Sequence, residues 1–185
     1  MSRPEPEKFD IVVIGAGPAG ERGAAQAAFF GKRVALVEGQ AKPGGACANT
    51  GTLPSKNFRE TALHLSGLAA RGITGVNIDM SRALTATKLI EKNKLVMQSE
   101  HERIYKNIEK HGLEHVEGHS EFEDKQTVVV KDAAGEIIRV LKAEHFLIAT
   151  GTSPHRPKEV PFDDKRICDS DSILGIAEIP RSIAV

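Results

Sequence analysis

Three glycines near the N-terminus have the spacing of a turn that binds a dinucleotide. They follow the apolar run of residues 11–14 with the spacing G-x-G-x-x-G, and an Ala-rich segment predicted to be a helix follows at residues 23–30. In such a turn the first glycine permits a sharp bend, the second lets the backbone approach a diphosphate, and the third lets helix pack on strand. The helix N-terminus favours negative charge. The predicted diphosphate contacts are Gly15, Gly17, Pro18, Ala19 and Gly20.

An acidic residue ends the next predicted strand. Residues 33–37 are mostly apolar and lead into Glu38, about 20 positions past the glycines, where a carboxylate can accept hydrogen bonds from ribose hydroxyls. The same carboxylate would repel a 2′-phosphate, so this site should not prefer an NADP-type adenosine. The alternative is an ordinary strand–helix–strand unit in which Glu38 is a solvated strand end.

Composition excludes several other classes of function. The 185 residues carry 25 basic and 25 acidic side chains, so no overall charge favours nucleic acid or membrane, and the absence of Trp removes a stacking platform. No stretch has the length of a spanning helix, and residues 1–8 are predicted to be a disordered lead-in rather than a signal peptide. Two cysteines do not make a disulfide framework, which favours a cytoplasmic location. The seven histidines show no metal-ligand spacing.

A second glycine-rich segment, residues 39–56, has two interpretations on composition alone. It could be a flexible connector, or a loop whose backbone lies close to a flat ligand. The order of its residues favours the ligand. From Gly44 to Lys56 it resembles the active-site segment of the flavoprotein disulfide reductase superfamily, G-G-x-C-x-N-x-G-C-[IL]-P-S-K. Cys47 occupies the first redox position, but Thr52 occupies the second, and a hydroxyl cannot form a disulfide.

One branch of that superfamily, the soluble pyridine nucleotide transhydrogenases, lacks the cysteine pair. The chain is similar to this branch at residues 17–21, 49–56 and 169–174, and the similarity extends from residue 9 to residue 185. It implies hydride transfer from NADPH to NAD⁺ through bound FAD. A missing cysteine also occurs in relatives that act as NAD(P)H oxidases or quinone reductases, and a non-catalytic FAD-binding module is a third alternative.

The resemblance also implies roles for individual residues. Lys56 would be the catalytic residue, a cation beside the N5 edge of the flavin that stabilises charge on the reduced ring. Cys47 would lie near the isoalloxazine, either as a reactive thiol or as a small apolar residue. The backbone at Gly118 and His119 would pass over the adenine. The remaining implied cofactor contacts are Gly44, Gly45, Ala46, Gly51, Thr52, Ala149, Thr150 and Gly151.

The other segments complete an α/β fold. A connector is expected over residues 65–79, followed by a long amphipathic helix at 83–110, to which we assign no chemistry. Short strands are expected at the following residues: 114–117, 118–123, 127–130 and 137–141. An apolar run over 144–152 ends in Ala-Thr-Gly. The expected fold is a Rossmann-like FAD-binding domain with a parallel sheet, a long helical pair and a small antiparallel β-meander.

The resemblance also suggests how the chain is divided. Residues 9–178 would be the N-terminal part of the FAD-binding domain. A short helix is expected from residue 171, and residues 179–185 would begin the first strand of an NAD(P)-binding domain. The chain would then be the N-terminal portion of a longer, homodimeric enzyme whose partners are small nucleotides, and it would be inactive alone.

Overall fold

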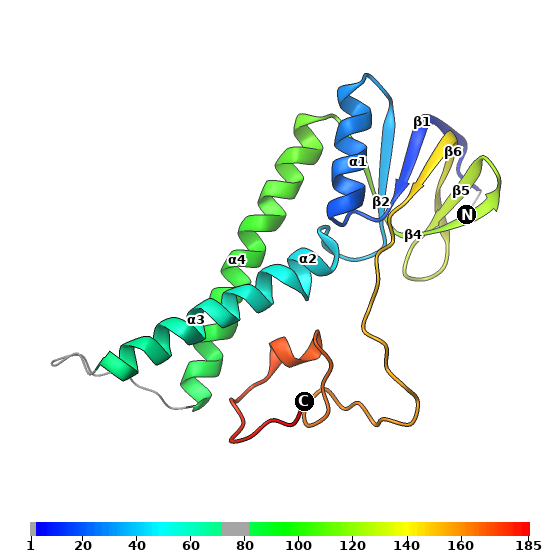
Figure 1. Ribbon diagram of the computed structural model, residues 1–185. Coiled ribbons are helices and arrows are strands. Elements are labelled where there is room, and N and C mark those ends of the chain that lie inside the picture. Colours follow the sequence, from blue (N-terminus) through cyan, green and yellow to red (C-terminus); the bar gives the residue numbers. More distant parts are fainter. Residues whose placement is uncertain (1–2, 72–81) are drawn as a thin grey trace. The chain divides into compact units, whose positions relative to one another are not determined.

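The computed structural model describes residues 3–71 and 82–185 of the chain. It contains two compact units, one formed by residues 1–48 and 100–152 and the other by residues 49–99 and 153–185. The first unit holds a six-stranded sheet of order β3-β2-β1-β6-β5-β4 (Figure 1). Its strands are β1 (Pro6–Ile14), β2 (Val34–Glu38), β3 (Glu114–Glu117), β4 (His119–Asp124), β5 (Thr127–Lys131) and β6 (Ile137–Ile148).

The sheet joins a parallel half to an antiparallel half through β6. The last residues of β6 pair with β1 in parallel, with Ile14 opposite Ile148, while its first residues pair with β5 in antiparallel fashion. Two separate strands were expected at 137–141 and 144–152. No glycine or proline interrupts residues 137–148, so the chain continues as one strand of 12 residues. The meander and the parallel sheet are therefore one sheet.

The expected lead-in of residues 1–8 is wrong at its C-terminal end. Strand β1 begins at Pro6, and residues 6–9 pair with residues 140–143 of β6. Proline fits at the first position of a strand, where no ladder hydrogen bond needs its missing N–H. Glu7 is also held by an ion pair with Arg139. Residues 6–8 are thus part of the sheet.

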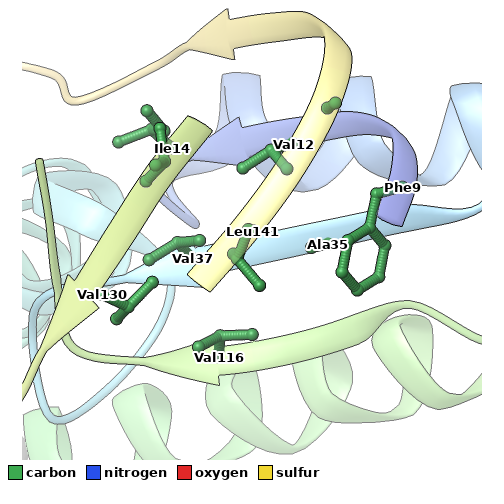
Figure 2. Packing of buried hydrophobic residues seen from close by; sticks show 10 residues of the cluster. Phe9, Val12, Ile14, Ala35, Val37, Val116, Val130 and Leu141 are labelled. Carbon is green, nitrogen blue, oxygen red and sulfur yellow. The ribbon is translucent and has the colours of Figure 1, made fainter. Parts of the chain in front are cut away.

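Alternate residues of the parallel strands build two cores on opposite faces. On one face Val13 and Leu36 pack with helix α1 (Pro18–Phe29) and with Ile104 of helix α4 (Arg82–Lys110), and Figure 1 shows these two helices beside the sheet. On the other face Val12 and Val37 meet residues from the antiparallel strands, as Figure 2 shows for Val130 and Leu141. Burial on both faces explains the nearly continuous apolar runs of β1 and β2.

The second unit contains helix α3 (Thr52–Arg71) and the first part of α4. The two helices are joined by a hydrogen bond between Asn57 and Asn93, and by one of 2.9 Å from Lys92 Nζ to Thr61 Oγ1. The connector expected at residues 65–79 begins later than predicted, because α3 continues to residue 71; residues 72–81 lie outside the described residues. In the described ranges, no helix combines the length and apolar content needed to cross a bilayer.

Ion pairs around Arg156 organise the C-terminal segment. Its guanidinium donates to Asp169 and Asp164, both at 2.6 Å, and a 3₁₀ turn η1 (Ser172–Gly175) follows where a short helix was expected. Residues 179–185, expected to begin the first strand of an NAD(P)-binding domain, form no strand ladder with the described residues, and that assignment stays a prediction. A strand is held by hydrogen bonds to a neighbour, and its apolar sequence alone does not supply one.

The packing of the meander against the parallel sheet is testable at Leu141. This side chain is fully buried in the core between the two halves of the sheet. We expect Leu141→Ala to lower the free energy of unfolding by about 2–5 kcal/mol, measured by urea denaturation. Lys142→Ala, at the neighbouring exposed position, is the control and should change it by about 0.5 kcal/mol or less. Equal effects of the two substitutions would contradict this packing.

The C-terminal segment should loosen in acid. Backbone N–H groups of Ile167, Arg166 and Lys165 lower the pKa of Asp163 to about 2. A carboxylate whose pKa is depressed in the folded state stabilises it above the unfolded value, and this stability is lost as the pH falls toward the folded pKa. We therefore expect hydrogen exchange at residues 165–167 to be slow at pH 5 and to lose protection between about pH 4 and pH 2.

The matched control for this acid loosening is Asp163→Asn. Asparagine keeps an acceptor oxygen for the same N–H groups but does not titrate. Its exchange rates, corrected for intrinsic chemistry, should not respond to pH in this window. A response equal to that of the unsubstituted chain would assign the loosening to another group.

Candidate functional site

The residues predicted to bind a dinucleotide meet at one edge of the sheet in the first unit. Strands β1, β2, β3 and β6 run parallel, so their carboxyl ends share this edge. Three backbone hydrogen bonds tie the ends together: Gly15 N–H donates to Val37 C=O at 2.8 Å, Ala149 N–H to Ile14 C=O at 2.8 Å, and Gly118 N–H to Glu38 C=O at 2.9 Å. Ligands of open α/β sheets bind outside such an edge.

The close approach of the end of β6 requires a glycine at the first position of the turn. Gly15 has a φ of +99°, and a β-carbon there would lie 2.4 Å from the carbonyl oxygen of Ala149 and 3.2 Å from the Cα of Thr150. No side chain fits in that space. The glycine-rich turn and the Ala-Thr-Gly strand end, which the sequence presents 130 residues apart, are therefore one backbone-to-backbone contact. Gly151, in contrast, has open space around it and a φ of +70°.

Helix α1 begins at Pro18 with its N-terminus at this edge. A β-carbon at Gly20 would lie 1.8 Å from the carbonyl oxygen of Gly15, so the helix approaches the turn as closely as backbone allows. Glu21 donates the first helical N–H bond, to Gly17 C=O at 2.9 Å. The N–H groups of Ala19 and Gly20 have no partner within the helix, and Pro18 has none to offer. N–H groups without a helical partner at a glycine-rich helix N-terminus fit a diphosphate.

The second glycine segment packs against the first. Gly44 N–H donates to Ala16 C=O at 2.7 Å, and a β-carbon at Gly45 would lie 3.1 Å from the Cα of Gly17. Gly44 and Gly45 both have positive φ, of +107° and +54°. A side chain at Gly45 would press on the first segment, and one at Gly44 would clash with Ala48 and Ile104. This part of the loop is therefore packed backbone against the diphosphate turn, and the flexible-connector alternative does not hold for it.

Glu38 is buried rather than solvated. Its side chain accepts the N–H of Ala16 on Oε2 and the N–H of Gln40 on Oε1, both at 2.8 Å, and the residue is 7% exposed. The alternative of a solvated strand end is wrong, because the carboxylate ties the end of β2 to the glycine turn. Each carboxylate oxygen has more than one lone pair, so both can still accept a ribose hydroxyl.

His119 contributes more than the backbone contact assigned from sequence. Its Nδ1 lies 2.8 Å from the place where a β-carbon of Gly39 would stand, so the imidazole covers the residue after Glu38. Gly118, with a φ of +144°, is confined from the other side, because a β-carbon there would lie 2.6 Å from the carbonyl oxygen of Lys131. These contacts place β4 next to the end of β2.

Comparison with known proteins identifies the family of this chain. Residues 9–185 match the family described as pyridine nucleotide-disulphide oxidoreductase. The chain belongs to this family. Soluble pyridine nucleotide transhydrogenases of Mycobacterium bovis (strain BCG / Pasteur 1173P2) and Chromohalobacter salexigens are 37% and 35% identical to it over 178 and 177 residues, which is 96% of this chain. It spans only 38% of the length of these relatives.

A solved structure supports the fold of this pyridine nucleotide-disulphide oxidoreductase. The Cu(II) complex of the HOCl-induced flavoprotein disulfide reductase RclA from Escherichia coli superposes with a TM-score of 0.72 over 94% of this chain and 36% of that one. At 24% sequence identity the likeness establishes the architecture. The Rossmann-like α/β fold expected from the sequence is confirmed.

The family's redox positions divide between the two units. Cys47 is half-buried on helix α2 (Gly45–Asn49), beside the exposed Ala46 in the first unit, and its thiol is free. In the second unit Gly51 C=O accepts the N–H of Ser55 at 3.0 Å and so starts α3. Thr52 is the exposed first residue of that helix.

Lys56 lies one helical turn after Thr52 and is exposed. Residues four apart share a helix face, so both face the same way from the start of α3. The ammonium of Lys56 is in no ion pair with the described residues. The role of Lys56 at a flavin stays a prediction.

No sequence pattern connects the helix expected at 83–110 with the site, yet α4 reaches the first turn of α1. Glu21, directly after the last glycine of the turn, is 2% exposed, and its carboxylate accepts hydrogen bonds from Arg103 and Asn107 of α4. A glutamate inside an otherwise apolar helix face was the available signal, but its partners are more than 80 residues away. Among the described residues no group of His, Cys, Asp or Glu could hold a metal ion.

The contact between Gly15 and the end of β6 can be tested with two alanine substitutions. Gly15→Ala adds strain from positive φ and a clash with the Ala149 carbonyl, so we expect it to lower the free energy of unfolding by more than about 3 kcal/mol. Gly31→Ala is the matched control, because Gly31 has a φ of +76° but open space around it, and should cost about 1 kcal/mol. Urea denaturation measures both, and equal losses would contradict the clash.

Proposed function

We propose that this chain is the FAD-binding portion of a soluble NAD(P)⁺ transhydrogenase of the Si-specific type, which passes hydride from NADPH to NAD⁺ through FAD without a redox disulfide. The observation that carries the proposal is Thr52, which stands in the sequence at the second redox-cysteine position of the family. The named function of the two relatives, transhydrogenation, supports it. The alternative, disulfide reduction, needs a second sulfur.

The backbone of the first unit would hold the nucleotide end of FAD. The N–H groups of Ala19 and Gly20, at the positive end of α1, would bind the diphosphate. Gly17 and Gly45 would let it lie close to the backbone on both sides. The Glu38 carboxylate, already held by two N–H groups, would accept hydrogen bonds from the adenosine ribose and disfavour a 2′-phosphate.

The residues of the glycine–cysteine segment would serve the flavin end. Bound flavin supplies a ring that accepts hydride from one nicotinamide and returns it to another. Lys56 would place a positive charge beside the ring and stabilise the negative charge of its reduced form. Cys47, with a threonine instead of a sulfur partner, would act as a small packing residue.

We also propose partners, a location and an oligomeric state for the enzyme. Its partners would be small nucleotides, with no nucleic acid or membrane, as the balanced charge of 25 basic and 25 acidic residues supports. We place it in the cytoplasm as a homodimer. A flavin-dependent NAD(P)H oxidase or quinone reductase is the second candidate, since Thr52 fits it equally, and a non-catalytic FAD-binding module is the third.

Acceptor preference tests the proposed reaction. Because the chain spans 38% of its relatives, the assay uses the protein at their full length, loaded with FAD and supplied with NADPH. We expect reduction of an NAD⁺ analogue with a distinguishable spectrum at kcat/KM at least about tenfold above that for oxygen, a quinone or a disulfide. A quinone or oxygen preference would favour the second candidate, and a flavin that NADPH does not reduce would favour the third.

Cys47→Ser is the internal control for the role of sulfur. If no disulfide takes part, the variant should keep kcat within about threefold, since serine replaces the thiol at similar volume. Loss of NAD⁺ reduction by two orders of magnitude in this variant, with FAD still bound, would contradict a mechanism without sulfur chemistry.

A further inference from the structure

The first turn of α1 carries a buried negative charge next to the proposed diphosphate site. Glu21 follows Gly20 directly, its side chain is 3% exposed, and its N–H donates to Gly17 C=O at 2.9 Å. It therefore belongs to the same helical turn as the N–H groups of Ala19 and Gly20. An unpaired carboxylate so close to a diphosphate would repel it, and more strongly in a buried position than in water.

Helix α4 supplies the partners of this carboxylate. Arg103 donates from both terminal nitrogens, one to each oxygen of Glu21, at 3.1 Å, and Asn107 Nδ2 donates to Oε1 at 2.9 Å. Arg103 also binds Glu100, through a 2.9 Å bond from Nη2. Hydrogen bonds to Glu100 and then to Glu21 raise the pKa of Arg103 above its ordinary value, so the guanidinium stays charged at every working pH.

The other elements packed on α1 present apolar side chains. These side chains are Val13 of β1, Leu36 of β2 and Leu147 of β6. A β-carbon at Gly23 of α1 would lie 2.4 Å from Leu147. Arg22, the basic neighbour of Glu21 in sequence, is exposed. In the described part of the chain, Arg103 is thus the cation that the structure places against Glu21.

The same helix also supports the second glycine segment. Ile104, the residue after Arg103, is 1% exposed, and its Cδ1 lies 2.9 Å from where a β-carbon of Gly44 would stand. Gly44 in turn bonds Ala16 of the diphosphate turn. Two adjacent residues of α4 therefore contact the two backbone segments between which the diphosphate would lie.

We propose that Arg103 is a positioning residue for the bound nucleotide: by neutralising Glu21 from α4, it lets the first turn of α1 accept an anionic diphosphate. The inference rests on the proposed function, in that FAD is the ligand. It assigns to α4 an electrostatic task at the cofactor in addition to its packing.

The affinity for FAD and its pH dependence test this role. In Arg103→Met, Glu21 keeps its charge near neutral pH without a cation, so we expect the Kd for FAD at pH 8 to rise at least about tenfold. A buried carboxylate without a partner takes up a proton more readily than an exposed one, so the affinity should recover as the pH is lowered toward about 6. Kd is measured by quenching of flavin fluorescence on the full-length protein.

A second-site substitution separates charge from packing. Glu21→Gln combined with Arg103→Met removes the buried carboxylate together with its cation and leaves Glu100, whose side chain is 25% exposed, as the remaining charge of the cluster. The double variant should bind FAD within about threefold of the unsubstituted protein at every pH. Arg139→Met is the matched control, because Arg139 also pairs with two glutamates, Glu7 and Glu114, but at the opposite end of the strands. It should change thermal stability while leaving the Kd for FAD within about threefold.

The outcomes distinguish this inference from the proposed function. A loss of affinity in Arg103→Met that is independent of pH and persists in the double variant would show a packing role only and overturn the inference. So would unchanged affinity at pH 8. If Arg103→Met does not fold, Arg103→Lys keeps the positive charge but loses the two parallel hydrogen bonds of the guanidinium. It should show a smaller loss of FAD affinity, and adding Glu21→Gln should remove that loss. Absence of FAD binding by the unsubstituted protein would overturn the proposed function and this inference with it.

Discussion

At the carboxyl edge of the sheet, the backbone of Gly15 lies so close to the carbonyl of Ala149 that no β-carbon fits between them. This close approach and the parallel pairing of β1 with β6 bring the end of β6 next to the turn that follows β1. Every other feature of the edge follows from it. The turn closes tightly enough for α1 to start against Gly15, and the end of β6 is held where a ligand over the turn would meet it.

Two glutamates border this turn, and the structure buries both. Glu38 is satisfied by backbone N–H groups, so it can hold its position and still accept hydroxyl donors. Glu21 is satisfied by side chains, and its main partner is a full positive charge. Buried carboxylates are stable only with such compensation. We propose that Glu38 is a polar contact for the ligand, and that Arg103 compensates the charge of Glu21.

Membership of the pyridine nucleotide-disulphide oxidoreductase family explains the scaffold, while one residue limits its chemistry. Cys47 and Cys168 are both free, and Thr52 begins α3 where a second redox sulfur would stand. The fold supplies a sheet edge suited to a nucleotide whether or not a second sulfur is present. We favour the transfer of hydride between nicotinamides over the oxidase or quinone reductase, which Thr52 fits equally, because the relatives in the comparison are named transhydrogenases.

The sequence alone determined the local structure and the type of edge. Spacing of Gly15, Gly17 and Gly20 after an apolar run, followed by an acidic strand end, predicted a strand–turn–helix unit. The long helix α4 and most strands lie close to their expected residues, whereas α1 begins at Pro18 instead of residue 23. Local patterns suffice there because turn geometry and helix faces depend on residues close in the chain. At residues 179–185 the same patterns do not suffice, since an apolar run becomes a strand only beside a partner.

Only the tertiary structure decided how distant segments share the edge. That β6 pairs with β1, that Ala149 explains Gly15, and that Arg103 pairs with Glu21 all involve residues separated by more than 80 positions. No periodicity links such pairs, because their contact depends on the packing of α1, α4 and the sheet around two cores. Spacing along the chain specified which groups could bind a nucleotide; packing determined which charges surround it.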